Sequence, residues 1–165
     1  MPLSHYNRFI TLPIIIFLIV VMLPFNGFAE ESRATLPEVL SLRDKAVSLL
    51  EKNGLESART EISKKDGEFI DRDLYVTILN MDGVMMAHGT IPALNGKNLM
   101  NYSDIDGKLY IKEAIESGKA NGEGFVTYKF SDPLTKKVSY KDMYFKIAVH
   151  GNDKYLVSVG HYKKQ

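Results

Sequence analysis

The sequence DLYVTILNMDG at Asp73–Gly83, followed by VMMAH at Val84–His88, decides the fold of this chain. Leu74–Leu79 is rich in β-branched and other apolar residues, which favour an extended strand. Asp82-Gly83 is a dipeptide that commonly joins two antiparallel strands in a tight turn. The stretch therefore predicts a β-hairpin whose strands are Leu74–Leu79 and Val84–His88.

Downstream of the hairpin, the sequence predicts a short helix and three more strands. The helix carries apolar residues over Leu109–Ile115 and ends through Gly118 and Asn121-Gly122. The strands are predicted at Gly124–Phe130, Asp142–Val149 and Lys154–Tyr162. Five strands with a helical crossover between the second and the third make an α+β domain with a mainly antiparallel sheet.

Upstream of the hairpin, apolar residues recur every three or four positions, which predicts two amphipathic helices. Thr35 and Glu38 have the spacing of a capping box, and Pro37 is tolerated in a first helical turn. Asn53-Gly54 ends the first helix, because glycine accepts the left-handed conformation that closes many helices. A shorter second helix follows and stops at Asp66-Gly67.

Both faces of the fourth predicted strand carry bulky residues, so we expect each side of the sheet to be covered. One face presents Met143, Phe145, Ile147 and Val149, and the other presents Tyr144, Lys146 and Ala148. The pattern fits a sheet with helices on one side and a pocket on the other. We expect the N-terminal helices to cover the first of these faces.

Residues 1–29 have the layout of a secretory signal peptide, with a basic start, an apolar run at Phe9–Phe25, and small residues at Gly27 and Ala29. We therefore expect cleavage before Glu30 and a periplasmic or secreted mature protein, residues 30–165, that forms one domain. An uncleaved membrane anchor is the alternative, because an apolar run of roughly 17 residues is near the lower limit for spanning a bilayer.

The composition argues against several classes of function. The chain has no cysteine, which excludes disulfides and thiol chemistry. No basic run pairs with an aromatic stripe, as nucleic-acid binding would require. His88, His150 and His161 lack metal-ligand spacing, and no nucleophile motif or phosphate loop is present. We therefore expect a protein that is not an enzyme and that uses no metal, cofactor or nucleic acid.

Four hydrogen-bond donors are candidates for holding a small anion, and these are His88, Tyr128, Lys141 and Tyr144. An ammonium group and a phenol both bind a carboxylate, and an imidazole binds it better when it is charged. On a regular strand Lys141 and Tyr144 face opposite sides, so we expect a strand start or a β-bulge at Lys141. The structural alternatives are a surface lysine, core tyrosines and a structural histidine. Tyr75 and Tyr110 are further candidates, with core packing as the alternative.

In order and spacing, the motifs of this chain resemble a single Cache domain of type 2, an extracellular sensor module related to PAS folds. The resemblance runs from Leu40 to Lys163. It rests on LLEKNGLESA at Leu49–Ala58, DLYV at Asp73–Val76, MDG at Met81–Gly83, AHG at Ala87–Gly89, LNGKNL at Leu94–Leu99, DGK at Asp106–Lys108, GEGFVTY at Gly122–Tyr128, KxxY at Lys141–Tyr144 and GHY at Gly160–Tyr162.

The resemblance implies a PAS-like fold, in which a long N-terminal helix packs on a curved five-stranded sheet. It also implies a pocket on the opposite face for small organic ligands, often short carboxylates. Two features depart from the family pattern. Phe130 stands where the family often has tryptophan, and the chain stops at Gln165, where sensor proteins continue into a membrane helix and a signalling region.

We therefore expect a periplasmic module that binds a small organic acid and acts with a membrane sensor or transporter. A structural or interaction domain with a collapsed pocket is one alternative, and an enzyme acting on a small organic acid is another. A homodimer formed through the N-terminal helix is a further expectation.

Overall fold

The structure is a computed structural model that describes residues 33–132 and 135–163. Its first element is a long helix, α1 (Leu36–Ile62). The Glu38 carboxylate accepts a hydrogen bond from the Thr35 N–H at 2.6 Å, which confirms the predicted cap. Gly54 interrupts the helix with a φ of 79°, in the left-handed region. The predicted break at Asn53-Gly54 is therefore confirmed, but the second helical segment follows it directly.

The N-terminal prediction concerns residues that the structure does not describe. The expected signal segment, residues 1–29, lies outside the described residues. Within residues 33–132 and 135–163, no helix has the length and apolar character needed to cross a membrane.

In the described part of the chain, six strands, all paired antiparallel, form one sheet in the order β1-β2-β6-β5-β4, with β3 also paired to β2. Their bounds are β1 Ile70–Asp71, β2 Leu74–Asn80, β3 Met85–His88, β4 Glu123–Ser131, β5 Val138–His150 and β6 Asp153–Tyr162. The five predicted strands and the α+β class are confirmed. The sequence did not predict β1, because two residues are too few to show an alternating pattern.

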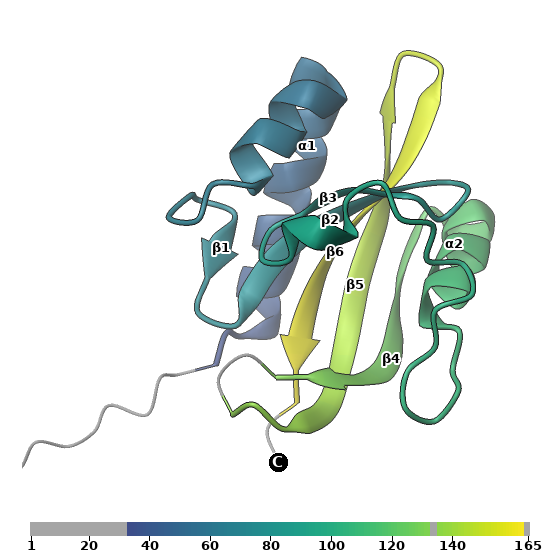
Figure 1. The fold of residues 1–165 in the computed structure, drawn as a ribbon. Coiled ribbons are helices and arrows are strands. Elements are labelled where there is room, and N and C mark those ends of the chain that lie inside the picture. Colours follow the sequence, from purple (N-terminus) through teal and green to yellow (C-terminus); the bar gives the residue numbers. More distant parts are fainter. Residues whose placement is uncertain (1–32, 133–134, 164–165) are drawn as a thin grey trace, which may run out of the picture. The chain divides into compact units, whose positions relative to one another are not determined.

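The connection from β3 to β4 contains a short 3₁₀ helix, η1 (Pro92–Leu94), and the helix α2 (Tyr110–Asn121). The predicted helical crossover is therefore confirmed. Gly122 ends α2 by donating its N–H to the Gly118 carbonyl at 2.9 Å. In Figure 1, α2 lies beside β4, whereas α1 lies behind the sheet, where it packs on β5, β6 and β2.

The sheet divides the apolar core into two clusters. On one face, α1 packs its buried residues, such as Val39 and Leu50, against the β6 residues Val157 and Val159. On the other face, α2 and the connection that precedes it pack against a second set of strand residues. This second face is the one that carries the candidate site.

Our assignment of the two faces of β5 was wrong. Met143 and Phe145 lie in the α2 cluster, whereas Tyr144 and Ala148 lie in the α1 cluster. The helix α1 therefore covers the second of the two predicted faces. Both faces are bulky, so periodicity alone shows that each is covered but does not show which helix covers it.

Candidate functional site

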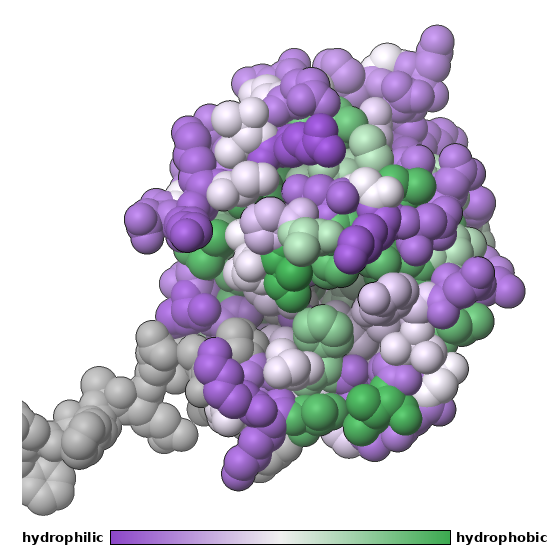
Figure 2. Space-filling model, in the orientation of Figure 1, coloured by the Kyte–Doolittle hydropathy of each residue, from purple (hydrophilic) through white to green (hydrophobic). Residues whose placement is uncertain are grey.

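A small cavity of about 40 Å³ lies between the second face of the sheet, α2 and the connection from β3 to α2. That volume accommodates a few water-sized groups. Figure 2 shows a hollow on this side of the molecule, with apolar side chains in it and hydrophilic ones around it. The cavity is lined by Tyr75, Thr77, Met85, His88, Leu94, Leu99, Tyr110, Ile111, Tyr128, Phe130, Lys141, Met143, Ser158 and Gly160.

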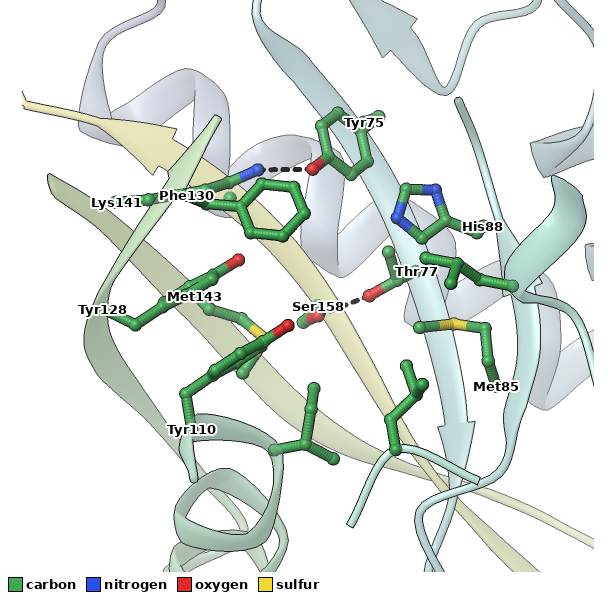
Figure 3. A pocket seen from close by; sticks show the side chains of 14 residues that line it. Tyr75, Thr77, Met85, His88, Tyr110, Tyr128, Phe130, Lys141, Met143 and Ser158 are labelled. Atoms are coloured by element: carbon green, nitrogen blue, oxygen red, sulfur yellow. Dashed lines mark hydrogen bonds between the residues drawn. The ribbon is translucent and has the colours of Figure 1, made fainter. Parts of the chain in front are cut away.

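Strand alternation explains why residues far apart in the sequence meet here. Side chains directly opposite each other on paired strands share a face of the sheet. Tyr128 of β4 is opposite Lys141 of β5, which is in turn opposite Tyr162 of β6. The three side chains therefore form one row across the cavity face. Figure 3 shows the labelled side chains converging from strands β2 to β6 and from α2.

Lys141 is the cation of this cavity, and only 1% of its surface is exposed. Its Nζ donates a hydrogen bond to Tyr75 Oη at 2.6 Å and a longer one to Tyr162 Oη at 3.4 Å. The same Nζ lies 4.0 Å and 4.5 Å from the ring centroids of these two tyrosines. Among the described residues, no carboxylate forms an ion pair with it. The buried ammonium group is therefore held by aromatic groups rather than by an opposite charge.

Burial changes the acid–base behaviour of this lysine. Desolvation disfavours the ammonium form and lowers the pKa of Lys141 to about 7, although the carboxylates of Asp73 and Asp132 oppose that change. The proton on Nζ is therefore weakly held. An anion close to Nζ would favour the charged form.

Gly160 provides the space that the Lys141 side chain occupies. A β-carbon at Gly160 would lie 1.7 Å from Lys141 Cε, which is far inside van der Waals contact. Sequence reasoning did not identify Gly160 as a site residue. A glycine inside a strand often marks a close approach, and this was the available signal.

His88 is a neutral donor in this site. Its Nδ1 accepts the N–H groups of Ile91 at 3.0 Å and Thr90 at 3.3 Å, so its proton is on Nε2. Burial, with a smaller contribution from Lys141, lowers the pKa of His88 to about 4. The second imidazole nitrogen faces the cavity in Figure 3. Burial and the charge of Lys141 thus both disfavour the charged imidazole that we expected to bind an anion better.

Tyr110 and Tyr128 form one wall of the cavity. Their rings stack with centroids 4.0 Å apart and an interplanar angle of 10°. Burial raises the pKa of both phenols, to about 12 for Tyr110, so both remain protonated donors. Figure 3 shows both hydroxyl groups directed into the cavity. Neither hydroxyl hydrogen-bonds to a residue within the described part of the chain.

Tyr144 does not belong to this cavity. The pairing of β5 with both neighbours continues through Lys141 and Tyr144 without a shift in register. The expected strand start or bulge is absent from β5, so the two side chains lie on opposite faces. Tyr144 instead stacks on Phe125 at 5.4 Å and packs against the α1 cluster.

The family model of the single Cache domain 2 matches residues 45–162. A periplasmic sensor domain of a chemotaxis protein is 27% identical, with a TM-score of 0.60, and the match covers 78% of this chain and 94% of that one.

Two other solved structures support the same fold. A Cache chemosensory domain, whose structure is described as the basis for carboxylic acid recognition, is 21% identical with a TM-score of 0.63, and the match covers 78% and 92% of the two chains. A methyl-accepting chemotaxis protein from Vibrio parahaemolyticus is 18% identical with a TM-score of 0.62, with coverage of 76% and 86%.

Proposed function

The chain belongs to the single Cache domain 2 family, and from this membership we propose that it binds a small carboxylate in the cavity at Lys141. The bound state would then be presented to a membrane signalling or transport partner on the outer side of the cytoplasmic membrane. The relatives of known structure include a periplasmic sensor domain of a chemotaxis protein and a methyl-accepting chemotaxis protein, which supports this setting.

One observation carries the proposal: Lys141 is a buried cation on a cavity wall, and no described carboxylate pairs with it. A buried charge without an opposite charge is costly. An anionic ligand would supply the missing charge and accept a short, charge-assisted hydrogen bond from Nζ.

The other hydrogen-bond donors of the cavity are available to bind the second oxygen of a ligand carboxylate. His88 presents an N–H group to the cavity, and Tyr110 and Tyr128 present hydroxyl groups. The remaining wall includes Met85 and Met143, which are flexible and apolar. A ligand whose carboxylate binds Lys141 and whose short aliphatic tail contacts Met85 and Met143 would match both the polar and the apolar parts of the cavity.

A thermal-shift screen of short aliphatic monocarboxylates tests this proposal. A ligand present at 100 times its dissociation constant adds roughly 2.7 kcal/mol to the free energy of unfolding. Lys141→Met should lower the affinity for any hit by roughly 2–5 kcal/mol. Lys146→Met is the matched control, because Lys146 is on the same strand but on the opposite face, close to Asp44 of α1. Equal binding by both variants would refute the proposed site.

A second function is favoured by the small size of the cavity. Phe130 lies against Lys141, with its ring centroid 5.7 Å from Nζ, and the free volume is about 40 Å³. An interaction domain with a closed pocket would have these features. It predicts that no carboxylate in the screen stabilises the protein, and that Phe130→Ala does not create binding.

A further inference from the structure

We propose that the paired hydroxyl groups of Thr77 and Ser158 bind a hydroxyl group of the ligand, so that the cavity prefers a short 2-hydroxy acid to the corresponding unsubstituted acid. We call Thr77 and Ser158 the hydroxyl pair. This inference rests on the proposed carboxylate site and specifies the class of carboxylate that the site binds.

The hydroxyl pair lies on the cavity face of two neighbouring strands, β2 and β6. Thr77 is directly opposite Ser158 in the register of these strands, and both side chains are buried. Their hydroxyl oxygens lie 2.7 Å apart, and either of them can be the donor. Both residues line the cavity, and Figure 3 shows their hydrogen bond among the side chains that surround it. The pair is therefore a polar part of the cavity wall that the carboxylate contacts proposed above do not use.

The hydroxyl pair keeps hydrogen-bonding capacity that the protein does not use. Two hydroxyl groups carry two protons and four lone pairs, and the bond between them uses one proton and one lone pair. Within residues 33–132 and 135–163, neither hydroxyl makes a further hydrogen bond. Because an unsatisfied buried polar group is costly, a partner inside the cavity is favoured. A ligand hydroxyl is both a donor and an acceptor, so it can use the remaining proton and a lone pair.

The position of Lys141 sets the distance between the two polar groups of the ligand. Its Nζ lies 2.5 Å from the place where a β-carbon of Gly160 would be. Ser158 is the next residue of β6 on the same face, about 6.6 Å along the strand, because a strand rises about 3.3 Å per residue. Two hydrogen bonds of about 2.8 Å each would fill most of that distance. The carboxylate and the hydroxyl group of the ligand must therefore be close together, as they are on the adjacent carbons of a 2-hydroxy acid.

Met143 supplies a third contact, which makes binding sensitive to the handedness of the ligand. It is directly opposite Gly160 in the register of β5 and β6, and it lines the cavity. In lactate, the carboxylate, the hydroxyl group and the methyl group are attached to one carbon. When Lys141, the hydroxyl pair and Met143 each bind one of these groups, only one enantiomer satisfies all three contacts.

Titrations of the wild-type protein with D-lactate, L-lactate and propionate, which lacks only the hydroxyl group, test the proposal. One lactate enantiomer should bind at least about fivefold more tightly than propionate and than the other enantiomer, as one net hydrogen bond allows. The two enantiomers have the same composition, so their comparison excludes an effect of ligand polarity alone. Titration at about pH 6 keeps Lys141 protonated, since its pKa is about 7. Lactates that bind no better than propionate, or that bind equally well, would overturn the proposal.

A double substitution assigns the preference to the hydroxyl pair. Thr77→Val combined with Ser158→Ala removes both partners of the hydrogen bond with little change in shape, which is close to neutral for stability. The double variant should lose the preference for lactate and the preference between enantiomers, while its affinity for propionate stays nearly unchanged. Thr127→Val is the matched control, because the Thr127 hydroxyl donates to Asp142 on the other face of the sheet. This control should keep the wild-type preferences.

The outcomes separate this inference from the proposed function. If propionate binds the wild-type protein as tightly as the better lactate does, only the hydroxyl preference is refuted. If none of the three acids binds, the carboxylate site and its hydroxyl preference are both refuted. A preference that survives in the double variant would overturn the assignment to Thr77 and Ser158. Ser158→Ala replaces the double variant if that protein does not fold, and it should reduce the preference because Thr77 then loses the partner that orients its hydroxyl group.

Discussion

Lys141 and Gly160 share one space on neighbouring strands, since the lysine side chain passes where a β-carbon of residue 160 would be. The pair explains how a long charged side chain is accommodated inside a sheet face. It also makes the position of the ammonium group sensitive to a single methyl group on the adjacent strand.

Gly160→Ala should therefore displace Lys141 and weaken carboxylate binding by at least about tenfold, while overpacking lowers the free energy of unfolding by roughly 1–3 kcal/mol. Urea unfolding and ligand titration measure the two effects. In a Lys141→Ala background the clash is gone, so the same alanine should cost much less stability. A full cost in that background would show that the glycine is needed for another reason.

The buried lysine predicts an unusual dependence of stability on pH. Burial lowers the pKa of Lys141 from 10.5 to about 7, so between these values the unfolded chain holds a proton that the folded protein has released. The free energy of unfolding should therefore rise with pH across this window, and the penalty should be complete below about pH 7. Urea unfolding of the wild type and of Lys141→Met at pH 6 and pH 9 measures it. The wild type should gain stability relative to Lys141→Met at the higher pH, and a relative loss would contradict the shift.

Carboxylate binding should depend on pH through Lys141 and not through His88. Above about pH 7 the neutral amine of Lys141 must take up a proton to bind an anion, so affinity should fall by up to about tenfold per pH unit. The pKa of His88 is lowered to about 4, so its imidazole signals should not titrate between pH 5 and pH 7 in NMR spectra. A His88 midpoint near the ordinary value of about 6.5 would contradict the assignment of a neutral donor.

The α1 side of the sheet should behave as an ordinary apolar core. Leu50 is fully buried there, and Leu50→Ala should lower the free energy of unfolding by roughly 2–5 kcal/mol. Leu36, in the first turn of the same helix, is 41% exposed and serves as the control. Its replacement by alanine should cost less than about 0.5 kcal/mol. Similar losses in chemical denaturation at the two positions would show that α1 does not cover the core through Leu50.

Local signals in the sequence predicted much of this fold. Asp82-Gly83 located the β2–β3 turn, and Gly54 located the break in α1, because each glycine adopts a positive φ that other residues resist. The order of the motifs also identified the family. The faces of β5 were harder to assign, because Tyr144 and Phe145 are both large and neither indicates which helix covers it.

The candidate site was only partly predictable. Lys141, Tyr128 and His88 were selected as donors, and the structure places all three on one cavity. Tyr144 was selected for its closeness to Lys141 in the sequence, although an unbroken strand separates such neighbours onto opposite faces. The ion pairs of Arg33 with Asp73 and Asp132 could not be predicted, because they form only when three distant segments of the chain come together.

The one-by-one alternation along β5 and β6 has a consequence for how this domain can diverge. Each residue that faces the cavity is followed by one that faces α1. Selection for ligand binding and selection for stable folding therefore act on different positions of these strands. Replacing Met143 or Ser158 would reshape the cavity without touching the packing of Val157 or Val159 on the helix. Effects of substitutions at sites without shared partners are close to additive. A lineage can therefore explore new ligands in single steps while keeping the same scaffold.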